Sequence, residues 1–167
     1  MPTEISDWND LDNVRNDLTG DYVLVNDLDS ETDGYAGVGD DFNPIGPELF
    51  DDNFHGTFDG QGNEIADLDV SVNQQGVGLF TGVGRGGDGT ELIENLSVSG
   101  SVTDTGANGF AGGVAGRVDN GTIENCVSHV DVTSDGDFVG GLVGDNSDTV
   151  TESYATGSVE GNEDVGG

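Results

Sequence analysis

The sequence contains no lysine, and three arginines are its only permanently cationic side chains against 34 aspartates and glutamates. The formal net charge of the 167 residues at pH 7 is therefore −31. Because nucleic acids and anionic lipids bind proteins mainly through lysine and arginine, this charge excludes both as ordinary partners. The acidic residues are spread along the whole chain, which indicates a halophilic protein, since molar salt shrinks the screening length to about 3 Å and removes most of the self-repulsion.

Cysteine is almost absent as well, since Cys126 is the single thiol. One thiol cannot form an internal disulfide or a zinc site made of several thiolates, and its simplest role is that of a small buried apolar side chain. No run of about 18 apolar residues is present, so the sequence predicts no membrane insertion in this segment. Residues 1–8 contain neither a basic stretch nor an apolar core, so they do not resemble a secretory signal.

What the sequence does contain is an internal repeat. Three ten-residue segments align without a gap, and they begin at Ile93, Ile123 and Val150. Each follows a glycine-rich block, such as Gly-Gly-Leu-Val-Gly at residues 140–144. Within the segments, small or apolar residues alternate with acidic or hydroxyl-bearing ones, and this period of two indicates strands with one buried face.

A single repeat unit, with two or three short strands, is too small to bury its apolar positions alone. Stacking equal units makes each apolar column continuous and pairs every strand with its equivalents above and below. The sequence therefore predicts an all-β fold, a parallel β-helix (solenoid), in one domain. Asn95 and Asn125 would stack as a side-chain amide ladder, which Glu152 interrupts.

The blocks at residues 140–144 and 149–159 resemble the GLUG repeat, found in large bacterial and haloarchaeal surface proteins that are similar to filamentous adhesins. The lead-in that precedes the first repeat in such proteins resembles Asp21–Asp29, Asn43–Gly46 and Phe54–Ile65. The resemblance covers residues 6–167. It implies a right-handed parallel β-helix and a surface context, and it brings no established catalytic residues with it.

Three segments are expected along the chain: a helical cap at residues 1–20, lead-in coils at 21–75, and repeat coils at 76–167 that end within a repeat. In the cap, Ser6 is the expected N-cap of a short amphipathic helix. The apolar face of this helix would consist of Trp8, Leu11, Val14 and Leu18. Such a helix would shield the open strand edges of the first coil. No similar cap is visible at the carboxyl end, so we expect the native polypeptide or a partner to continue the stack.

Four acidic residues form a candidate calcium site: Asp29, Glu31, Asp33 and Asp40. They occupy positions 1, 3, 5 and 12 of a calcium-loop pattern that has Gly34 at position 6. The match is imperfect at positions 3 and 12, and the flanking segments do not resemble EF-hand helices, so a chance match in an acidic chain is the alternative. Residues 86–94 also resemble one nonapeptide calcium repeat, with Glu91 where aspartate belongs, but a lone copy favours an ordinary loop. Calcium is thus the one candidate cofactor.

Paired carboxylates are relevant because polysaccharide-cleaving enzymes share this fold class. Asp67 and Asp69, on one face of the expected strand at residues 64–72, have a spacing that suits acid hydrolysis. Many other pairs in this chain have the same spacing, so a solvated acidic face is the simpler interpretation. A lyase would need a cation, for which Arg85 and Arg117 are the candidates, and both lie in glycine-rich corners without a partner motif.

The two histidines, His55 and His129, are each expected alone on a strand with the ring pointing outward. No Ser-His-Asp arrangement and no phosphate-binding loop can be assembled from the sequence. Glycosylation sequons begin at Asn95 and Asn120, and only Asn120, at a corner of the stack, is a candidate acceptor.

These features favour a non-enzymatic module that is extracellular, at the cell surface or on a virion. Its expected role is adhesion, host or surface recognition, or structural display. Its partners would be a cell-surface glycan or protein, or other subunits of a virion or appendage, and a homo-oligomer is compatible with the fold. The loops at residues 82–92 and 103–109 are the expected recognition surface. Because residues 1–8 do not resemble an export signal, two interpretations are left. One is a virion component, which needs no such signal, and the other is a surface protein whose sequence has been trimmed. The alternative function is a glycan-degrading β-helix enzyme, a lyase or a hydrolase.

Overall fold

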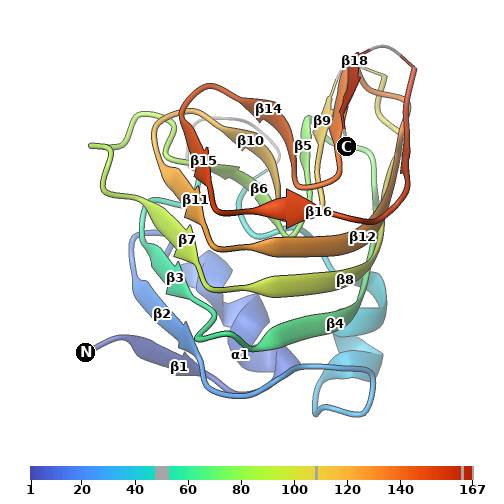
Figure 1. Ribbon diagram of the computed structural model, residues 1–167. Helices are drawn as coiled ribbons and strands as arrows, with labels where there is room; N and C mark the ends of the chain where they lie inside the picture. Colours follow the sequence, from blue (N-terminus) through green and yellow to red (C-terminus); the bar gives the residue numbers. More distant parts are fainter. Residues whose placement is uncertain (48–52, 108, 163, 167) are drawn as a thin grey trace.

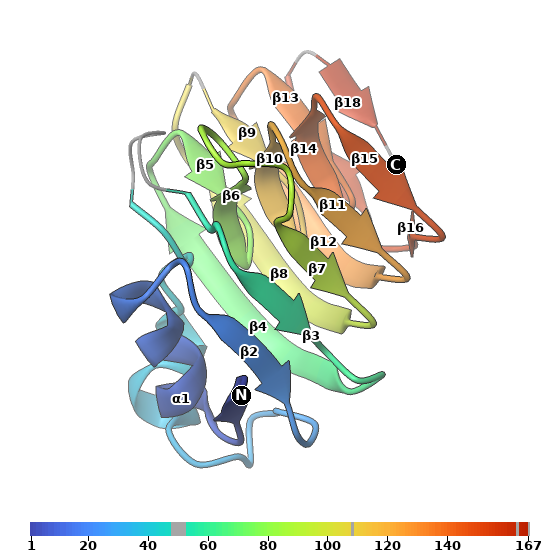
Figure 2. The ribbon, with the colours of Figure 1, turned by 90° about the vertical axis from the view of Figure 1, so that its left-hand side faces the viewer.

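The computed structural model describes residues 1–47, 53–107, 109–162 and 164–166. The chain winds into a stack of coils, with the short helix α1 (Trp8–Asn13) at one end and β18 (Asp164–Gly166) at the other (Figures 1 and 2). Every strand pair within this described part is parallel, as in a β-helix. This confirms the predicted all-β parallel solenoid with a short N-terminal helix.

The strands of the described ranges form four sheets. The first runs in the order β1 (Thr3–Ile5), β2 (Asp21–Leu24), β3 (Thr57–Asp59), β7 (Leu92–Glu94), β11 (Thr122–Glu124) and β15 (Thr149–Thr151). The second contains β4 (Glu64–Val72), β8 (Ser97–Asp104), β12 (Val127–Ser134), β16 (Tyr154–Ala155) and β17 (Val159–Glu160). The third contains β6 (Phe80–Val83), β10 (Ala115–Val118) and β14 (Val143–Asn146). The fourth contains β5 (Gly76–Val77), β9 (Phe110–Ala111), β13 (Phe138–Gly140) and β18.

The register follows the sequence repeat. Ile93 pairs with Ile123, which in turn pairs with Val150, so the predicted apolar column is continuous. The coil that begins with β7 contributes one strand to each sheet, and it therefore has four strands rather than the two or three expected. The sequence understates this number because strands such as β5 and β9 are only two residues long, too short for a period of two to be seen.

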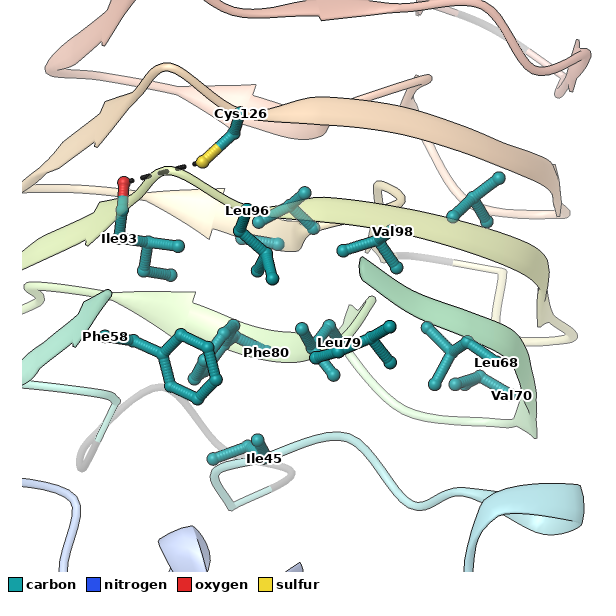
Figure 3. Packing of buried hydrophobic residues seen from close by; sticks show 14 of the residues in the cluster. Ile45, Phe58, Leu68, Val70, Leu79, Phe80, Ile93, Leu96, Val98 and Cys126 are labelled. Carbon is teal, nitrogen blue, oxygen red and sulfur yellow. Dashed lines mark hydrogen bonds between the residues drawn. The ribbon is translucent and has the colours of Figure 1, made fainter. Parts of the chain in front are cut away.

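The coils shorten along the stack. Residues in contact across neighbouring coils are 36 and 35 positions apart near the N-terminus, and 30 and then 27 apart further on. The wide early coils hold aromatic side chains: the ring of Phe80 lies 4.9 Å from that of Phe54 and 5.7 Å from that of Phe58, all fully buried. The narrower coils above are filled by Ile93, Val98 and other smaller side chains (Figure 3). The size of the side chains in the core thus changes together with the length of each coil.

The N-terminal cap differs from the expectation in two ways. Asp7, not Ser6, is the N-cap of α1, because its carboxylate accepts the amide of Asp10 at 2.9 Å. Ser6 lies one residue earlier and donates its amide and hydroxyl to the carboxylate of Asp10, at 3.0 and 2.8 Å. The helix ends at Asn13 and continues as the 3-10 helix η1 (Val14–Asn16), so Leu18 lies outside it.

The cap also contains a strand that the sequence analysis missed, since β1 pairs with β2 and is the outermost strand of the first sheet. Together β1 and α1 bury Ile5, Trp8 and Leu11, each at most 1% exposed. The segment boundaries after residues 20 and 75 stay predictions. Within the described ranges, no helix has the length and apolar character needed to cross a membrane.

The predicted amide ladder is present and longer than expected. Asn125 Nδ2 donates to Asn95 Oδ1 at 2.8 Å, and Asn95 Nδ2 donates to the carboxylate of Asp59 at 3.0 Å. Both asparagines have positive φ angles, 54° and 50°, in the left-handed region where asparagine is enriched. Glu152, the next residue in the column, has the same conformation with a φ of 50°. It lacks the side-chain amide that would extend the ladder.

Glu152→Asn is therefore expected to stabilise the protein by about 0.5–1.5 kcal/mol, the net value of one hydrogen bond. Asparagine also adopts the left-handed conformation of this residue more readily than glutamate does. Thermal unfolding in molar salt measures the change. The matched control is Glu152→Gln, which removes the same charge without the local preference of asparagine. If the two variants were equally stable, the gain would come from charge alone.

Candidate functional site

The predicted calcium ligands lie in the loop that follows β2. The carboxylate of Asp29 accepts the amide of Glu31 and the hydroxyl of Thr32, both at 2.9 Å, so it caps its own turn. The backbone carbonyls of Asp29 and Asp33 accept the indole and the backbone N–H of Trp8, at 2.9 and 3.1 Å. The loop therefore holds the buried tryptophan of the cap in place.

The four predicted ligands are all exposed, and Asp40 lies apart in the 3-10 helix η3 (Gly39–Asp41), which follows the 3-10 helix η2 (Tyr35–Gly37). Among the residues that the structure describes, no three side chains of histidine, cysteine, aspartate or glutamate gather closely enough to hold a metal ion. The structure thus does not bring Asp29, Glu31, Asp33 and Asp40 together, and calcium binding by them stays a prediction.

The carboxylates proposed for hydrolysis have unsuitable surroundings. Asp67 and Asp69 are both exposed on β4. Hydrogen bonds from the side chain and backbone of Ser30 lower the pKa of Asp67, and the amide of Ser30 lies 3.0 Å from its carboxylate. A general acid needs the opposite shift, a pKa raised towards neutrality. Asp69 instead accepts the hydroxyl of Ser101 at 3.2 Å, across the coils.

Arg117 has a structural role. Its guanidinium lies 2.7 Å from the carboxylate of Asp119 and 3.2 Å from that of Asp145 on the next coil. It also lies over the ring of Phe110, 5.2 Å from the centroid. Arg117 therefore joins β10 to β14. Arg85, the other candidate for lyase chemistry, is exposed in the loop between β6 and β7.

The expectation that each histidine lies alone on a strand is wrong, because both rings contact a residue of another coil and only His129 lies on a strand, β12. His129 Nδ1 lies 2.5 Å from the hydroxyl of Thr156 on the next coil. His55 precedes β3 and is partly buried, and its Nδ1 lies 3.3 Å from Oε1 of Glu91. The sequence could not reveal these partners because they belong to other coils.

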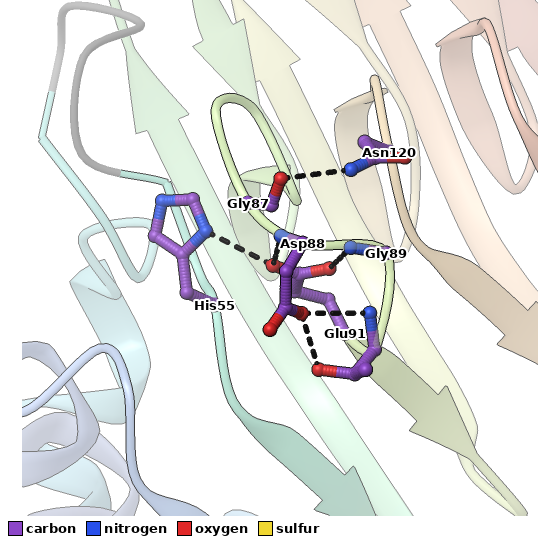
Figure 4. A network of polar contacts seen from close by, with 7 residues as sticks. His55, Gly87, Asp88, Gly89, Glu91 and Asn120 are labelled. Atoms are coloured by element: carbon purple, nitrogen blue, oxygen red, sulfur yellow. Dashed lines mark hydrogen bonds and ion pairs between the residues drawn. The ribbon is translucent and has the colours of Figure 1, made fainter.

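Glu91 is the centre of a largely buried polar cluster (Figure 4). Its side chain is only 2% exposed, and its two carboxylate oxygens accept the amides of Asp88 and Gly89 at 3.1 and 2.9 Å. A Cβ atom at Gly87 would lie 1.7 Å from Oε1 of Glu91, so a side chain there would displace this carboxylate. Asn120, the candidate glycosylation acceptor, donates its side-chain amide to the carbonyl of Gly87 at 3.0 Å.

Next to this cluster lies a shallow polar cavity of about 380 Å³, lined by His55, Gly86, Gly87, Asp88, Thr90 and Glu91. The hydroxyl of Thr90 donates to Asp88 at 2.6 Å, and hydrogen bonds from Thr90 lower the pKa of Asp88. Thr90 is therefore directed at Asp88 and not at the imidazole, so it is not placed as a nucleophile activated by His55. What the arrangement does is fix the conformation of the loop at residues 84–91.

Glu91→Ala is expected to destabilise the protein by about 1–3 kcal/mol, because the amides of Asp88 and Gly89 lose their acceptor in a largely buried place. Hydrogen exchange at these two amides should accelerate more than exchange in the core strands. Asp148→Ala, at the exposed equivalent corner of a later coil, is the control and should change stability by less than about 0.5 kcal/mol. Equal effects of the two substitutions would contradict this role of Glu91.

Asp104 is a second buried carboxylate that the sequence did not single out. It is 2% exposed, accepts the amide of Gly106 at 2.8 Å and accepts the hydroxyl of Ser134, on the next coil, at 2.8 Å. Burial raises the pKa of Asp104 above its usual value, despite these hydrogen bonds. The residue closes the corner at residues 103–109, of which Asn108 lies outside the described residues.

A raised pKa in the folded state means that folding favours the protonated carboxyl. The stabilisation is complete below the unfolded pKa of about 3.8 and is lost as the pH rises through the folded value. Asp104→Asn has no carboxyl at this position and should not lose stability in this way. The free energy of unfolding of the variant minus that of the wild type should therefore increase as the pH is raised through this window. Urea unfolding at a series of pH values measures the difference, and a difference that does not vary with pH would disprove the assignment.

Cys126 has the expected role. It is fully buried, and its Sγ lies 3.3 Å from the carbonyl of Glu124 and 3.6 Å from that of Ile93. Burial raises the pKa of the thiol to about 11, so the thiolate is scarce at neutral pH. The side chain is part of the packed core (Figure 3).

Comparison with known proteins agrees with this geometry. Residues 107–133, which span β9 to β12, match the family model of the GLUG motif. Over 141 residues, or 81% of the chain, the sequence is 37% identical to halomucin of Haloquadratum walsbyi. The chain is a GLUG-repeat protein. It spans only 1% of the length of halomucin.

A similar solved structure is that of a candidate immunoglobulin A1 protease from Bacteroides ovatus, with a TM-score of 0.62 and 24% identity. The likeness covers 97% of this chain and 59% of that one, and it supports the fold alone.

The glycines of the GLUG block have a clear physical basis. Gly116 closes the block at residues 112–116 and lies against the preceding coil. A Cβ atom there would lie 2.6 Å from the amide nitrogen of Val77 and 2.8 Å from the carbonyl oxygen of Thr81. Because both obstacles are backbone atoms, a side chain could not be accommodated without moving the coils apart. Gly116 thus marks one place in the GLUG block where the backbones of neighbouring coils approach each other closely.

Proposed function

We propose that this GLUG chain is a rigid, non-enzymatic β-helix segment of a haloarchaeal surface protein, displayed outside the cell for recognition of surface glycans or proteins. The observation that carries the proposal is the regular stack itself, whose coils are joined by parallel strand pairs and by apolar columns such as Ile93, Ile123 and Val150. Such a solenoid grows linearly and holds its side loops away from its base without needing a disulfide. Halomucin belongs to a cellular organism, a haloarchaeon, and not to a virus. The similarity therefore favours a cell-surface protein over a virion component.

The loop at residues 84–91 is the proposed contact surface. It projects from the side of the stack between β6 and β7 (Figure 1). Val83 pairs with Val118, and Leu92 pairs with Thr122, so eight residues stand here where the next coil has only residues 119–121. Glu91 accepts the amides of Asp88 and Gly89, which holds this part of the loop backbone in place. An ordered loop loses less conformational entropy when it binds a partner.

The chemistry of this loop suits neutral or cation-bridged ligands. Asp88, Gly89 and Thr90 are exposed, and they offer carboxylate and hydroxyl groups to a ligand. Surface sugars carry hydroxyl groups that such side chains can bind, whereas anionic partners would be repelled by the charge of −31. A glycan-degrading enzyme is less well supported, because exposure and lowered pKa make Asp67 a poor general acid.

A loop exchange tests the proposal. Residues 84–91 are replaced by Asp-Asn-Gly, the corner at residues 119–121 of the next coil, which spans the same two strands. We expect the wild-type protein to be retained on haloarchaeal cell envelopes in molar salt and the exchanged variant to lose most of this retention. Circular dichroism checks that the variant is folded.

The control is an exchange of the same size elsewhere, at an exposed corner that the proposal does not involve, and it should leave retention unchanged. Equal retention of the wild type and the loop variant would exclude the loop as the contact. Failure of the wild type to exceed an unrelated acidic halophilic protein would overturn envelope recognition. Release of reducing sugar from acidic or neutral polysaccharides would overturn the non-enzymatic assignment.

A further inference from the structure

The shallow cavity beside Glu91 has the size and the lining of a site for one small polar molecule. Its volume of about 380 Å³ lies at the small end of the range of about 300–1,000 Å³ that is usual for small-molecule sites. Its lining is mostly polar, which favours a ligand with hydroxyl groups over an apolar one. A protein partner usually covers about 800 Å² on each side, whereas a cavity of this volume holds a single small unit.

The imidazole of His55 is held in place from two sides. Its backbone amide donates to the carbonyl of Leu18 at 2.7 Å, and its Nδ1 lies 3.3 Å from Oε1 of Glu91. Because both oxygens of Glu91 already accept backbone amides, this carboxylate acts as an acceptor and Nδ1 must be the donor. The contact thus selects the tautomer with the proton on Nδ1. It leaves Nε2, on the side of the ring away from Glu91, as an acceptor (Figure 4).

Asp88 supplies a second acceptor at the same cavity. Its Oδ1 accepts both the amide and the hydroxyl of Thr90, at 3.1 and 2.6 Å. These two contacts fix the orientation of the carboxylate and leave Oδ2 for a ligand. The side chain of Asp88 is exposed, and its backbone amide is held by Glu91 at 3.1 Å. Both acceptors, on Asp88 and on His55, are therefore placed before a ligand arrives.

Two glycines keep the wall between these acceptors free of side chains. A Cβ atom at Gly86 would meet nothing within 4 Å, so the space over this residue is open. A Cβ atom at Gly87 would lie 2.9 Å from Nδ1 of His55, in addition to its close approach to Glu91. A side chain at Gly87 would therefore disturb the contact that orients the imidazole. With glycine at both positions, a ring-shaped ligand can approach the backbone closely.

We infer that this cavity binds one neutral sugar unit, with Nε2 of His55 and Oδ2 of Asp88 each accepting a hydroxyl of the ligand. The inference rests on the proposed function, because it names the ligand class of the same loop and chooses a glycan over a protein. Two acceptors require a ligand that donates at two points, which the hydroxyls of a sugar do and a carboxylate does not. Because the acceptors are already oriented, little conformational entropy is lost on binding.

The net charge and the working conditions narrow the ligand further. An anionic sugar would be repelled by the charge of −31. A lysine side chain of a protein partner could also donate to both acceptors. Molar salt shortens the screening length to about 3 Å, however, and removes most of the charge attraction on which such a contact depends. A neutral sugar loses nothing in this way, because its hydrogen bonds carry no net charge.

NMR of the isotope-labelled protein in molar salt tests the inference. The probes are the methyl glycosides of glucose, galactose and mannose, added up to about 100 mM because single sugar units bind weakly. At least one probe should shift the amides of Asp88, Gly89 and Thr90 and the Nε2 signal of His55, and these shifts should saturate. His129, the other histidine, lies on β12 and should not respond. The methyl glycoside of glucuronic acid should cause no shift.

Two substitutions remove the acceptors one at a time. His55→Phe keeps a ring but loses Nε2, and Asp88→Asn replaces Oδ2 by a donor while its remaining oxygen can still accept from Thr90. Each should weaken sugar binding about tenfold, the effect of losing one hydrogen bond to the ligand. His129→Phe is the matched control and should bind as the wild type does. Asp88→Asn keeps the backbone contact with Glu91, so it remains informative if His55→Phe fails to fold.

Several results would overturn the inference. One is the absence of saturable shifts with all three neutral glycosides, and another is a proton on Nε2 instead of Nδ1 at a pH where the imidazole is neutral. A third is binding of a lysine-containing tripeptide in place of the sugars, and a fourth is unchanged sugar affinity in both variants. Retention on cell envelopes without sugar binding would leave the proposed function intact and remove only this inference. Sugar binding without envelope retention would do the reverse.

Discussion

Lowering the salt concentration below about 0.5 M is expected to unfold or loosen this protein, and molar salt should restore it. The structure shows one place where like charges face each other. In the first sheet, Asp59 pairs with Glu94, which pairs with Glu124, so three carboxylates lie in register on adjacent strands. Adjacent strands are about 4.8 Å apart, which exceeds the screening length of about 3 Å at 1 M salt but is well inside the 10 Å at 0.1 M. Like charges placed directly opposite each other are destabilising.

Circular-dichroism melts across a salt series measure this effect. Replacing Glu94 and Glu124 by glutamine should lower the salt concentration needed for folding. The control replaces Glu31 and Glu160, which removes the same charge from a loop and from a position paired with Thr133. A melt that does not change between low and molar salt would refute the halophilic interpretation. Equal shifts in the two double variants would show that net charge matters and the carboxylate column does not.

Phe80→Ala should destabilise the protein by about 3–5 kcal/mol, the usual cost of removing a buried aromatic ring and leaving a cavity. Phe80 is fully buried between Phe54 and Phe58, at the level where the coils are widest (Figure 3). The backbone there is paired on both sides, with Ile45 through a single bridge and with Ala115 through β10. The surroundings are therefore held in place and cannot collapse into the space.

Urea unfolding at constant molar salt measures this loss without changing the screening of charge. Tyr154→Ala is the comparison, because its ring is 56% exposed and its removal should cost less than about 0.5 kcal/mol. A cost for Phe80→Ala close to that of Tyr154→Ala would mean that the aromatic layer is not the main source of stability in the early coils.

The repeat made much of the fold predictable. In a solenoid, a residue contacts its own equivalent one period along the chain, so columns such as Ile93, Ile123 and Val150 can be recognised by aligning the sequence with itself. The same logic identified the pair Asn95 and Asn125. It failed for β1 and for the N-cap, because the cap lies outside the repeat and follows only local rules.

The contacts of the candidate site, in contrast, could not be predicted by aligning the sequence with itself. His55 and Glu91 are 36 residues apart, and neither has an equivalent in the neighbouring coils that could mark it. Asp104 and Ser134 are equivalent in register, but they differ in chemistry, so the alignment does not suggest a bond between them. The predicted calcium ligands were close in sequence, yet their loop turned its polar groups towards Trp8 and its own backbone.

By itself, the sequence determined the charge, the period of the stack and the columns that are buried, because each of these depends on composition or on a regular spacing along the chain. Only the tertiary structure decided that Glu91 is buried beside His55 and that Asp104 closes a corner. These features arise where the translational symmetry of the coils is broken. A contact there depends on the path of one particular loop in space, which no repeating pattern encodes.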